Sequence, residues 1–478
     1  MNLITPPSVR KLQRALYAKA KANPAYRFYT LFDKIYRKDV LVTAWSRCRA
    51  NGGSAGVDGQ SFAGIEHKGV EAWLEQLAQE LRTKAYRPQA VRRVNIPKAD
   101  GKTRPLGIPT IKDRVAQMAV VTVLEAIFEA DLTDEQYAYR PKRSAHDAIR
   151  KVHQLLNRGY THVVDADLKG YFDTIPHHEL MKSVARRVSD AAVLRLIKEW
   201  LEMAVEETDR RGNKRRTTVN KDNGKGTPQG APISPLLANL YMRRFLLGWK
   251  QRGWNQKLQA HIVNYADDFV ILCHRKAQEA QERMAKIMKA LKLEVNQQKT
   301  RICQVPEESF DFLGYTFGRC YRAKTGQAYI GTKPAKKRVL KACESISEKT
   351  QSKASGRETE EIIGELNLML KGWANYFRLG SVSKAYESVD SHVRNRLRQW
   401  LKRKHKIRGR AETHFPDEYL YQRLGVIRLT HFQTNLPWAK AKYYPCPKAG
   451  CEMWSSHLCG VGLVSCWRRG SLDEPYAT

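Results

Sequence analysis

Two neighbouring carboxylates, Asp267 and Asp268, interrupt an apolar stretch between residues 261 and 273. The residues on both sides are largely β-branched or aromatic, which is typical of buried strands. Adjacent acids in such a place repel each other and lose hydration, and bound cations are the simplest way to offset that cost. The pair therefore predicts a divalent metal site at the tip of a β-hairpin.

A third acid, Asp167, closes another strand-like stretch that begins at Thr161. A strand that ends in Asp beside a hairpin tipped with two Asp residues is the minimum ligand set for two divalent ions about 3.5–4 Å apart. One ion lowers the pKa of an attacking hydroxyl, and the other neutralises a leaving pyrophosphate. Hard carboxylate oxygens favour Mg²⁺, with Mn²⁺ as a substitute. The alternative for each acid is a turn role, which is at least as common for an isolated Asp-Asp pair.

The net charge of the chain is strongly positive. Its 478 residues include 84 Lys and Arg against 48 Asp and Glu, which gives +36. Such an excess is typical of polyanion binding, because each neutralised phosphate releases counterions. Every apolar run falls short of the roughly 20 residues that span a bilayer, and the N-terminus lacks the pattern of a signal peptide. We therefore expect a cytoplasmic protein of two or three domains that acts on nucleic acid and has no membrane partner.

Five of the nine cysteines are scattered, which suits a reducing compartment. The other four gather near the end, at Cys446, Cys451, Cys459 and Cys466, with His457 among them. Four residues separate the first two, so the tight spacing of a zinc knuckle is missing. We expect a loosely structured tail here rather than a zinc site.

Hydrophobic periodicity and turn residues predict the elements that must hold the acids. Residues 1–50 carry eleven basic and two acidic residues in a helical pattern, and a Gly-rich loop follows at 51–59. We expect a helix pair there whose aromatics pack and whose Lys and Arg face phosphate. Further helices are expected at 70–85, 112–131, about 178–206 (with some interruption), 277–292, 358–377 and 383–404, and one that the segment 226–235 opens and that runs through Trp249. Strands are expected at 91–96, 161–167, 261–273 and 310–317. The connections are expected to be a hairpin turn at 99–102, a basic hairpin or loop at 208–225 and a polar linker at 348–358.

The segment Gly226-Thr-Pro-Gln-Gly230 decides between these interpretations. The ordered set of segments 96–109, 137–146, 165–173, 226–239, 265–268, 293–300 and 310–317 resembles the fingers and palm of a reverse transcriptase. More closely, it resembles the protein encoded by bacterial mobile group II introns, over roughly residues 10–435. The loop at 51–59 is similar to that family's additional N-terminal block, and residues 371–377 are similar to its maturase region.

This resemblance implies an α+β fold of the right-hand polymerase type, with an antiparallel palm sheet, helices behind it and an α-helical thumb after it. The expected domains are a basic N-terminal extension (1–60), fingers (61–160), a palm with fingers insertions (161–320), a thumb or maturase domain (335–435) and a short tail (436–478). The implied activity is RNA-directed DNA synthesis, in which dNTPs extend a DNA primer on an RNA template. Binding and splicing of an intron RNA, and action on a DNA target, are implied with it.

The resemblance also implies roles for residues around the metal ions. Asp167, Asp267 and Asp268 correspond to the family's metal-binding triad, and Leu168 would add a backbone carbonyl. Phe172 falls at the family's steric gate, an aromatic ring that collides with a ribose 2′-OH. A packed palm aromatic is an equally compatible interpretation of Phe172.

Nucleotide-binding residues are implied in three segments. Lys98 and Arg104 match the fingers cations that hold the incoming triphosphate, although by themselves they would read as solvated hairpin charges. Gln229 and Gly230 match the loop that supports the nucleotide and the template base, where glycine permits close backbone approach. Lys299 matches a position near the triphosphate, as a proton donor to pyrophosphate.

We expect RNA phosphates to bind three basic segments: the loop at 137–146, the stretch 208–225 and the helical stretch 391–410, which has nine basic residues and no acid. The residues singled out there are Arg140, Arg143, Arg394, Arg398 and Lys402. The aromatics at 373, 376 and 377 are at helical spacing and are expected in the core rather than stacked on bases.

The C-terminal end departs from the family pattern. Many relatives carry a DNA-binding segment and a zinc-supported endonuclease there, but only about forty residues follow Thr434. We therefore expect no second-strand cleavage, and either insertion into DNA already exposed as single strand or a degenerate tail. Three other functions stay open: an RNA-binding splicing factor with an inert palm, a domesticated reverse transcriptase in phage defence or CRISPR adaptation, and an RNA-dependent RNA polymerase, against which Phe172 argues.

Overall fold

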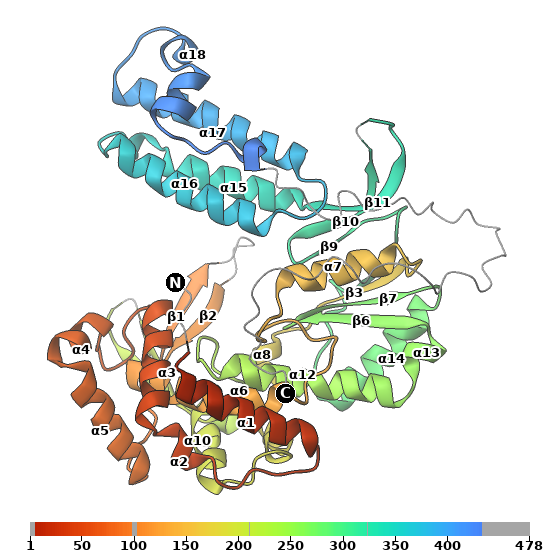
Figure 1. Ribbon diagram of the computed structural model, residues 1–478. Coiled ribbons are helices and arrows are strands. Elements are labelled where there is room, and N and C mark those ends of the chain that lie inside the picture. Colours follow the sequence, from red (N-terminus) through yellow and green to blue (C-terminus); the bar gives the residue numbers. More distant parts are fainter. Residues whose placement is uncertain (1–4, 98–102, 210, 323, 433–478) are drawn as a thin grey trace.

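Three small β-sheets lie between an N-terminal and a C-terminal group of helices (Figure 1). The structure is a computed structural model that describes residues 5–97, 103–209, 211–322 and 324–432. Within these ranges the named strands pair antiparallel, except for the parallel pair β1 (Val91–Pro97) and β4 (Val205–Thr208). The molecule is therefore α+β with antiparallel sheets, as expected.

The N-terminal helices pack around α6 (Ile111–Glu129). This helix is buried on most sides because α1 (Pro7–Ala22) and α3 (Lys38–Asn51) lie against it. Thr110 begins it by accepting a hydrogen bond from the Asp113 N–H. The same core is completed by α2 (Phe32–Ile35), α4 (Phe62–Lys68), α5 (Val70–Arg82), α9 (His177–Ala185) and α10 (Ala191–Leu201).

The expected helix at 178–206 breaks between α9 and α10 at Asp190. Its carboxylate accepts hydrogen bonds from the first turn of α10, at the N–H groups of Ala192 and Val193. It also accepts the N–H groups of Leu31 and Phe32, 2.8 Å away. One carboxylate therefore both starts a helix and holds the N-terminal extension to it.

The first sheet has the strand order β2-β1-β4-β5, with β2 at Thr103–Ile108 and β5 at Lys214–Thr217. The expected turn at 99–102 lies outside the described residues. The basic stretch at 208–225 forms the β4–β5 hairpin and α11 (Val219–Asn223). Glu206 pairs with Lys214 and Arg216 across the hairpin.

The central sheet has the order β6-β7-β3-β8, from strands Ala260–Tyr265, Asp268–Cys273, His162–Ala166 and Arg301–Gln304. Successive side chains of a strand point to opposite faces, and both faces are covered here. Val164 and Ile271 join the core beneath α12 (Ser234–Gln251) and α14 (Ala277–Ala290). Val163 and Leu272 join a second core with α7 (Ala145–Leu156). The short helices α8 (Tyr171–Thr174) and α13 (Trp254–Lys257) lie beside this sheet (Figure 1).

The third sheet corrects one expectation. Residues 310–317 were expected to form one strand, but they form β9 (Phe310–Phe312) and the start of β10 (Tyr315–Tyr321), which pairs with β11 (Ala328–Pro334). Leu313 and Gly314 have φ values of 51° and 80° and reverse the chain in two residues. Two positive φ values are the geometry of a tight hairpin turn, and Leu-Gly lacks the usual Asn-Gly signal.

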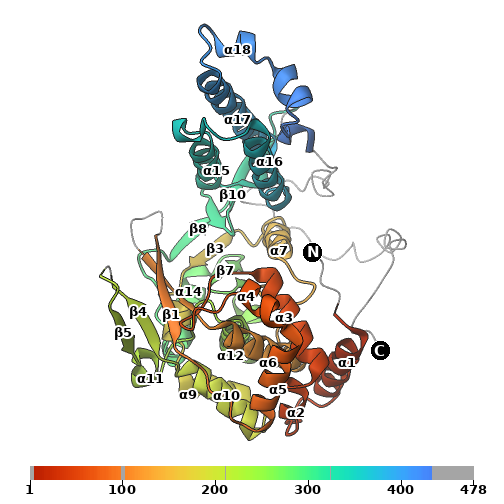
Figure 2. The same cartoon turned by 90° about the vertical axis from the view of Figure 1, so that its left-hand side faces the viewer.

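The C-terminal helices α15 (Lys336–Lys349), α16 (Thr359–Tyr376) and α17 (Ser383–Lys404) form a separate core around Leu366, Leu397 and Trp400. Figure 2 shows them stacked beyond the β10 sheet. The unit ends with α18 (Ala411–His414), a π turn at Tyr419–Arg423 and a 3₁₀ turn at Leu429–Phe432.

The expected linker at 348–358 lies inside this helical unit, between α15 and α16. It includes a 3₁₀ turn at Ser352–Ala354, and Thr350 and Ala354 are buried. Its polar residues are used locally, since Arg357 pairs with Glu361 and Glu365. In the described ranges, no helix combines the length and apolar character needed to cross a membrane.

Candidate active site

The register of the central sheet brings acids from two distant segments to one end of it. Ala166, the last residue of β3, pairs with Phe269 of β7. Asp167 directly follows Ala166 and Asp268 directly precedes Phe269, so the two acids lie at the same end of this strand pair. Asp165 lies two residues before Asp167 and therefore shares its face of the sheet.

The turn that carries Asp267 is held by Asn264. Ala266 adopts a left-handed conformation with φ 58°. The Asn264 side-chain amide donates to the Ala266 carbonyl at 2.8 Å, inside the turn. The Asn264 backbone bonds to Glu135 and Tyr137, so the tip is also tied to the segment before α7. The Asn264 Oδ1 atom is buried without a partner.

The electrostatics of the acids favour a bound cation. Burial, then the charges of Asp267, Asp167 and Asp165, raises the pKa of Asp268 to about 6, and Arg338 opposes the shift. The residue as a whole nevertheless keeps an exposed surface, so solvent weakens both the effect of burial and this repulsion without removing them. Solvent-accessible carboxylates that repel one another suit hard divalent ions, of which Mg²⁺ is the commonest at phosphate chemistry.

Asp167 is at present held by nitrogen donors. The Lys299 Nζ atom lies 3.2 Å from the Asp167 Oδ2 atom, and the Asn296 side-chain amide donates to the same oxygen at 3.1 Å. Among the described residues, no three His, Cys, Asp or Glu side chains are gathered closely enough to hold a metal as they stand. Binding an ion therefore requires Asp167 to release Lys299 or to use its other oxygen.

Asp165 and Arg301 form a further pair on this face. Burial raises the pKa of Asp165, and Arg301, 3.7 Å away, opposes that shift. The backbone of Leu168 forms a bridge to Val295, but the two hydrogen bonds come from its neighbours, Lys169 N–H to Glu294 and Asn296 N–H to Asp167. These bonds do not involve the Leu168 carbonyl.

The loop with Gln229 and Gly230 packs against β2. The Gly107 N–H donates to the Gln229 carbonyl at 2.7 Å. Gly230 has φ 109°, and an added Cβ would lie 2.5 Å from the Gly107 carbonyl oxygen, so only glycine fits. The Gln229 side chain donates to Asp173 at 2.8 Å.

Phe172 adjoins this loop through a backbone hydrogen bond. It is 8% exposed, its carbonyl accepts the Thr227 N–H at 2.7 Å, and Gly170 precedes its helix with φ 57°. The ring therefore packs in the core with one edge open, which is compatible with both interpretations of this residue.

The comparisons with known proteins agree with this geometry. Residues 96–317 match the model of the reverse transcriptase (RNA-dependent DNA polymerase) family, and residues 339–415 match the maturase-specific domain of group II introns. Protein YkfC of Escherichia coli (strain K12) is 34% identical over 359 residues, 67% of this chain and 91% of the relative. The chain belongs to the group II intron-type reverse transcriptases.

Two further relatives cover less of their own length. The group II intron-encoded protein LtrA of Lactococcus lactis subsp. cremoris is 29% identical over 309 residues, 63% of this chain and 48% of the relative. An uncharacterized 91 kDa protein in the cob intron of Schizosaccharomyces pombe is 29% identical over 216 residues, 44% of this chain and 25% of the relative. This reverse transcriptase chain thus spans about half the length of LtrA.

Two expected triphosphate ligands of the reverse transcriptase are only partly placed. Lys98 lies outside the described residues. Arg104 belongs to β2, where its backbone is opposite Ile96. The cysteine-rich tail, and with it the expectations on zinc and on an endonuclease, also lies outside them.

Arg140 was expected to bind RNA phosphates, but its side chain is engaged inside the protein. Its side chain is 4% exposed and pairs with Glu129. It also donates to the carbonyls of Thr133 and Gln136, at 2.6 and 2.9 Å. Arg140 therefore holds the turn that precedes Tyr137, and the Tyr137 N–H bonds to Asn264 in the β6–β7 hairpin that carries Asp267 and Asp268. Arg143, by contrast, is partly exposed and pairs with Asp134, which is almost fully exposed.

The arginines of α17 are also used inside the protein. Arg394 pairs with Asp417, and Arg398, 14% exposed, pairs with Asp417 and donates to the Phe415 carbonyl. They fasten α17 to the segment after it, whereas the sequence predicts that they face RNA phosphates. Lys402, in the last turn, is partly exposed, and the exposed cations nearby are Arg403, Lys406, Arg408 and Arg410.

The expected core aromatics of α16 pack as predicted. Phe377 is 7% exposed, and the Tyr376 hydroxyl donates to the Leu313 carbonyl at 2.8 Å. Sequence reasoning missed Asp165, Asn264 and Asn296. Only Asp165 carried a signal, because strand periodicity places it on the face of Asp167.

Proposed function

We propose that this chain extends a DNA primer on an RNA template by transferring nucleotides from dNTPs, with Asp167, Asp267 and Asp268 holding two Mg²⁺ ions. The observation that carries this proposal is the set of mutually repelling carboxylates at one end of the central sheet, within the segment that matches the reverse transcriptase family. When bound, the ions would supply a lowered pKa for the primer hydroxyl and neutralisation of pyrophosphate.

The chain's own residues would then position the substrates. Lys98 and Arg104 bind the triphosphate, and the loop at Gln229 and Gly230 supports the nucleotide. Phe172 excludes the ribose 2′-OH, and Lys299, once it leaves Asp167, gives a proton to pyrophosphate. The Leu168 carbonyl completes the ligands. Lys299 is the least constrained of these, since its side chain is 69% exposed.

We assign the parts of a right hand as follows. Residues 1–60 form a basic extension, 61–160 the fingers, 161–320 the palm with fingers insertions, 335–435 the thumb and 436–478 a tail. The assignment is supported by the first sheet, which joins β1 and β2 to β4 and β5 across the fingers–palm boundary, and by the separate core of the C-terminal helices.

We further propose that the C-terminal helices bind and help to splice an intron RNA. The match to the maturase-specific domain and the exposed cations after α17 support this. The five described cysteines are unpaired, which supports a reducing compartment such as the cytoplasm.

The test is primer extension by an Asp267→Asn variant. We expect cDNA synthesis with Mg²⁺ to fall about a thousandfold or more, because several kcal/mol of charge stabilisation are lost. Affinity for the template–primer should stay near wild type, measured in parallel. The matched control is Asp33→Asn, which removes a carboxylate from a surface ion pair with Lys34 in α2. Undiminished synthesis by Asp267→Asn would contradict the proposed metal site.

A further inference from the structure

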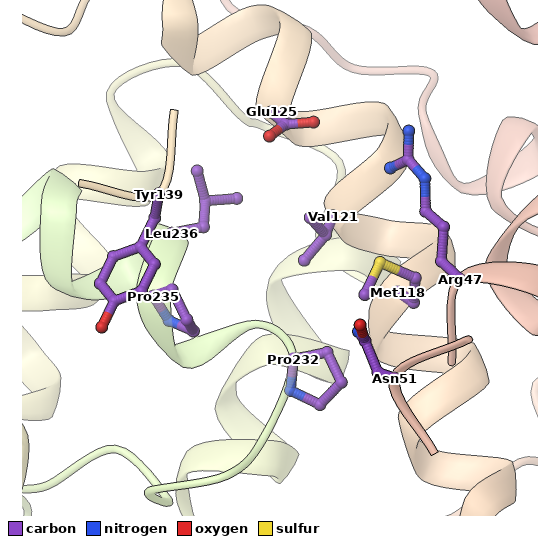
Figure 3. A pocket seen from close by; sticks show the side chains of 9 residues that line it. All are labelled: Arg47, Asn51, Met118, Val121, Glu125, Tyr139, Pro232, Pro235 and Leu236. Atoms are coloured by element: carbon purple, nitrogen blue, oxygen red, sulfur yellow. The ribbon is translucent and has the colours of Figure 1, made fainter. Parts of the chain in front are cut away.

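A pocket of about 290 Å³ lies beside the loop of Gln229 and Gly230, between α3, α6 and the start of α12 (Figure 3). Its apolar side is formed by Met118, Val121, Pro232, Pro235 and Leu236. Pro232 follows Gly230 by two residues, so their Cα atoms are at most about 7 Å apart. The pocket therefore adjoins the loop that the proposed function assigns to the nucleotide and the template base.

The other four residues that line the pocket, Arg47, Asn51, Glu125 and Tyr139, carry polar groups. Figure 3 shows Glu125 at one end, and Arg47 and Asn51 across the pocket from Tyr139. Burial raises the pKa of Glu125, and the charge of Arg47 opposes that shift. An apolar floor with amide and carboxyl groups at its edge matches a nucleobase, which offers flat faces and a polar edge.

Tyr139 is an exposed aromatic in a constrained backbone. It is 50% exposed and has φ 55°, which is uncommon for a residue other than glycine, asparagine or aspartate. Its neighbours are fixed on both sides: Asn239 donates to the Ala138 carbonyl at 2.7 Å, and Arg140 is in its buried ion pair. Strained backbone is a feature of binding sites, and an exposed aromatic ring beside a pocket is suited to stacking on a base.

The far rim of the pocket is also fixed before any ligand arrives. Asn51 is the last residue of α3, and Arg114 of α6 donates to the carbonyls of Gly52 and Ser54 just after it. Ligand pockets usually hold about 300–1,000 Å³, so this one has room for about one ring system. A whole nucleotide with its triphosphate would not fit inside it.

We propose that this pocket takes one unpaired RNA base of the template, the base next to the one being copied. The proposal rests on the proposed function, because a template must continue past the Gln229–Gly230 loop. Tyr139 stacks on the base, Asn51 and Glu125 meet its edge, and Arg47 neutralises the adjoining backbone. Holding that base apart from its neighbours keeps the copied base in register.

The experiment measures the equilibrium affinity of the full chain for a DNA primer annealed to RNA templates. The first template extends one nucleotide past the primer, and that nucleotide is the base to be copied. The second template extends two nucleotides past the primer. We expect the second nucleotide to tighten binding roughly tenfold, because base–aromatic stacking contributes about 1–3 kcal/mol. A template whose second nucleotide is abasic should bind less than about twofold more tightly than the one-nucleotide template, because the base rather than the phosphate fills the pocket.

Tyr139→Asn tests the ring with a residue that tolerates left-handed backbone, and should reduce the tenfold gain to about twofold. Affinity for the one-nucleotide template should not change. Tyr29→Ala, an exposed tyrosine of the N-terminal body, is the matched control and should keep the full gain. Glu125→Gln should change the preference among the four bases at the second position and leave the abasic template unaffected.

The outcomes separate the two proposals. The proposed base pocket is overturned if the second nucleotide tightens binding equally when it is abasic, or equally in Tyr139→Asn. It is also overturned if the second nucleotide does not tighten binding by the wild type. Failure to bind or extend even the one-nucleotide template would instead count against the proposed polymerase function.

Discussion

At the scale of single residues, the acids proposed to bind metal also destabilise the fold without it. The pKa of Asp268, raised to about 6 by burial and by Asp267, Asp167 and Asp165, exceeds the value near 3.9 of an unfolded chain. Protonated Asp268 therefore contributes its full stability below about pH 4, and that contribution is lost as pH rises through 6. Above pH 6 the metal-free site is at its least favourable.

Asp268→Asn should accordingly raise the Tm of the metal-free protein at pH 8 by about 1–2 °C, and by less at pH 5. Mg²⁺ should raise the Tm of the wild type more at pH 8 than at pH 5, and that of the variant little at either pH. Differential scanning calorimetry with and without EDTA measures these shifts. A variant less stable than wild type at pH 8 would contradict the argument, and Asp33→Asn provides the matched comparison.

At the scale of elements, the structure turns a basic loop into a brace for the catalytic hairpin. The ion pair of Arg140 and Glu129 holds the turn at Thr133–Gln136, whose continuation bonds to the backbone of Asn264. Asn264 in turn holds Ala266, between Tyr265 and Asp267. The acids thus depend on a segment more than one hundred residues away in the chain.

Arg140→Gln should lower the free energy of unfolding by about 3 kcal/mol, because it leaves Glu129, only 16% exposed, without its partner. RNA affinity of the folded variant should stay near wild type. Urea unfolding and RNA titration measure the two quantities. Arg143→Gln, on an exposed pair, should show the reverse pattern: little loss of stability and weaker RNA binding. Weaker RNA binding by Arg140→Gln at unchanged stability would restore the original expectation.

At the scale of the whole molecule, the chain has a net charge of +36. Exposed Lys and Arg side chains occur on α1, β5, α14 and α17, whereas Asp165, Asp167, Asp267 and Asp268 gather at one end of the central sheet. In the stretch 391–410, Arg394 and Arg398 form ion pairs within the protein, and Arg396 donates hydrogen bonds to backbone carbonyls. The cations after α17 stay exposed. Long-range attraction to RNA therefore comes from the molecule's surface, and the separate core of the C-terminal helices presents one part of it.

Changing Arg403, Lys406, Arg408 and Arg410 together to Gln should weaken binding of a structured intron RNA and reduce the slope of log affinity against log salt by up to about 3. Extension of a short template–primer should change little, since these residues lie outside the catalytic sheet. A control with the same charge change, at the exposed Arg275, Lys276, Lys286 and Lys289 of the α14 region, should keep a steeper slope. Equal losses in both variants would mean that net charge alone sets the affinity.

The sequence by itself determined the helices with clear periodicity and the strands that flank Asp167 and the Asp267–Asp268 pair, because hydrophobic periodicity is a local property. The roles of the three acids stay predictions. The boundaries of α6 and α17 differ from expectation by at most two residues. Local pattern also sufficed for the family, since the motifs follow one another in order.

Only the tertiary structure decided which basic side chains form ion pairs within the protein. Arg140, Arg394 and Arg398 look like the exposed arginines beside them in the sequence, but their partners come from other elements. The same holds for the turn at Leu313, for Asn264 and for the pocket beside Tyr139. A side chain's exposure depends on contacts between distant segments, and no local pattern of residues encodes those contacts.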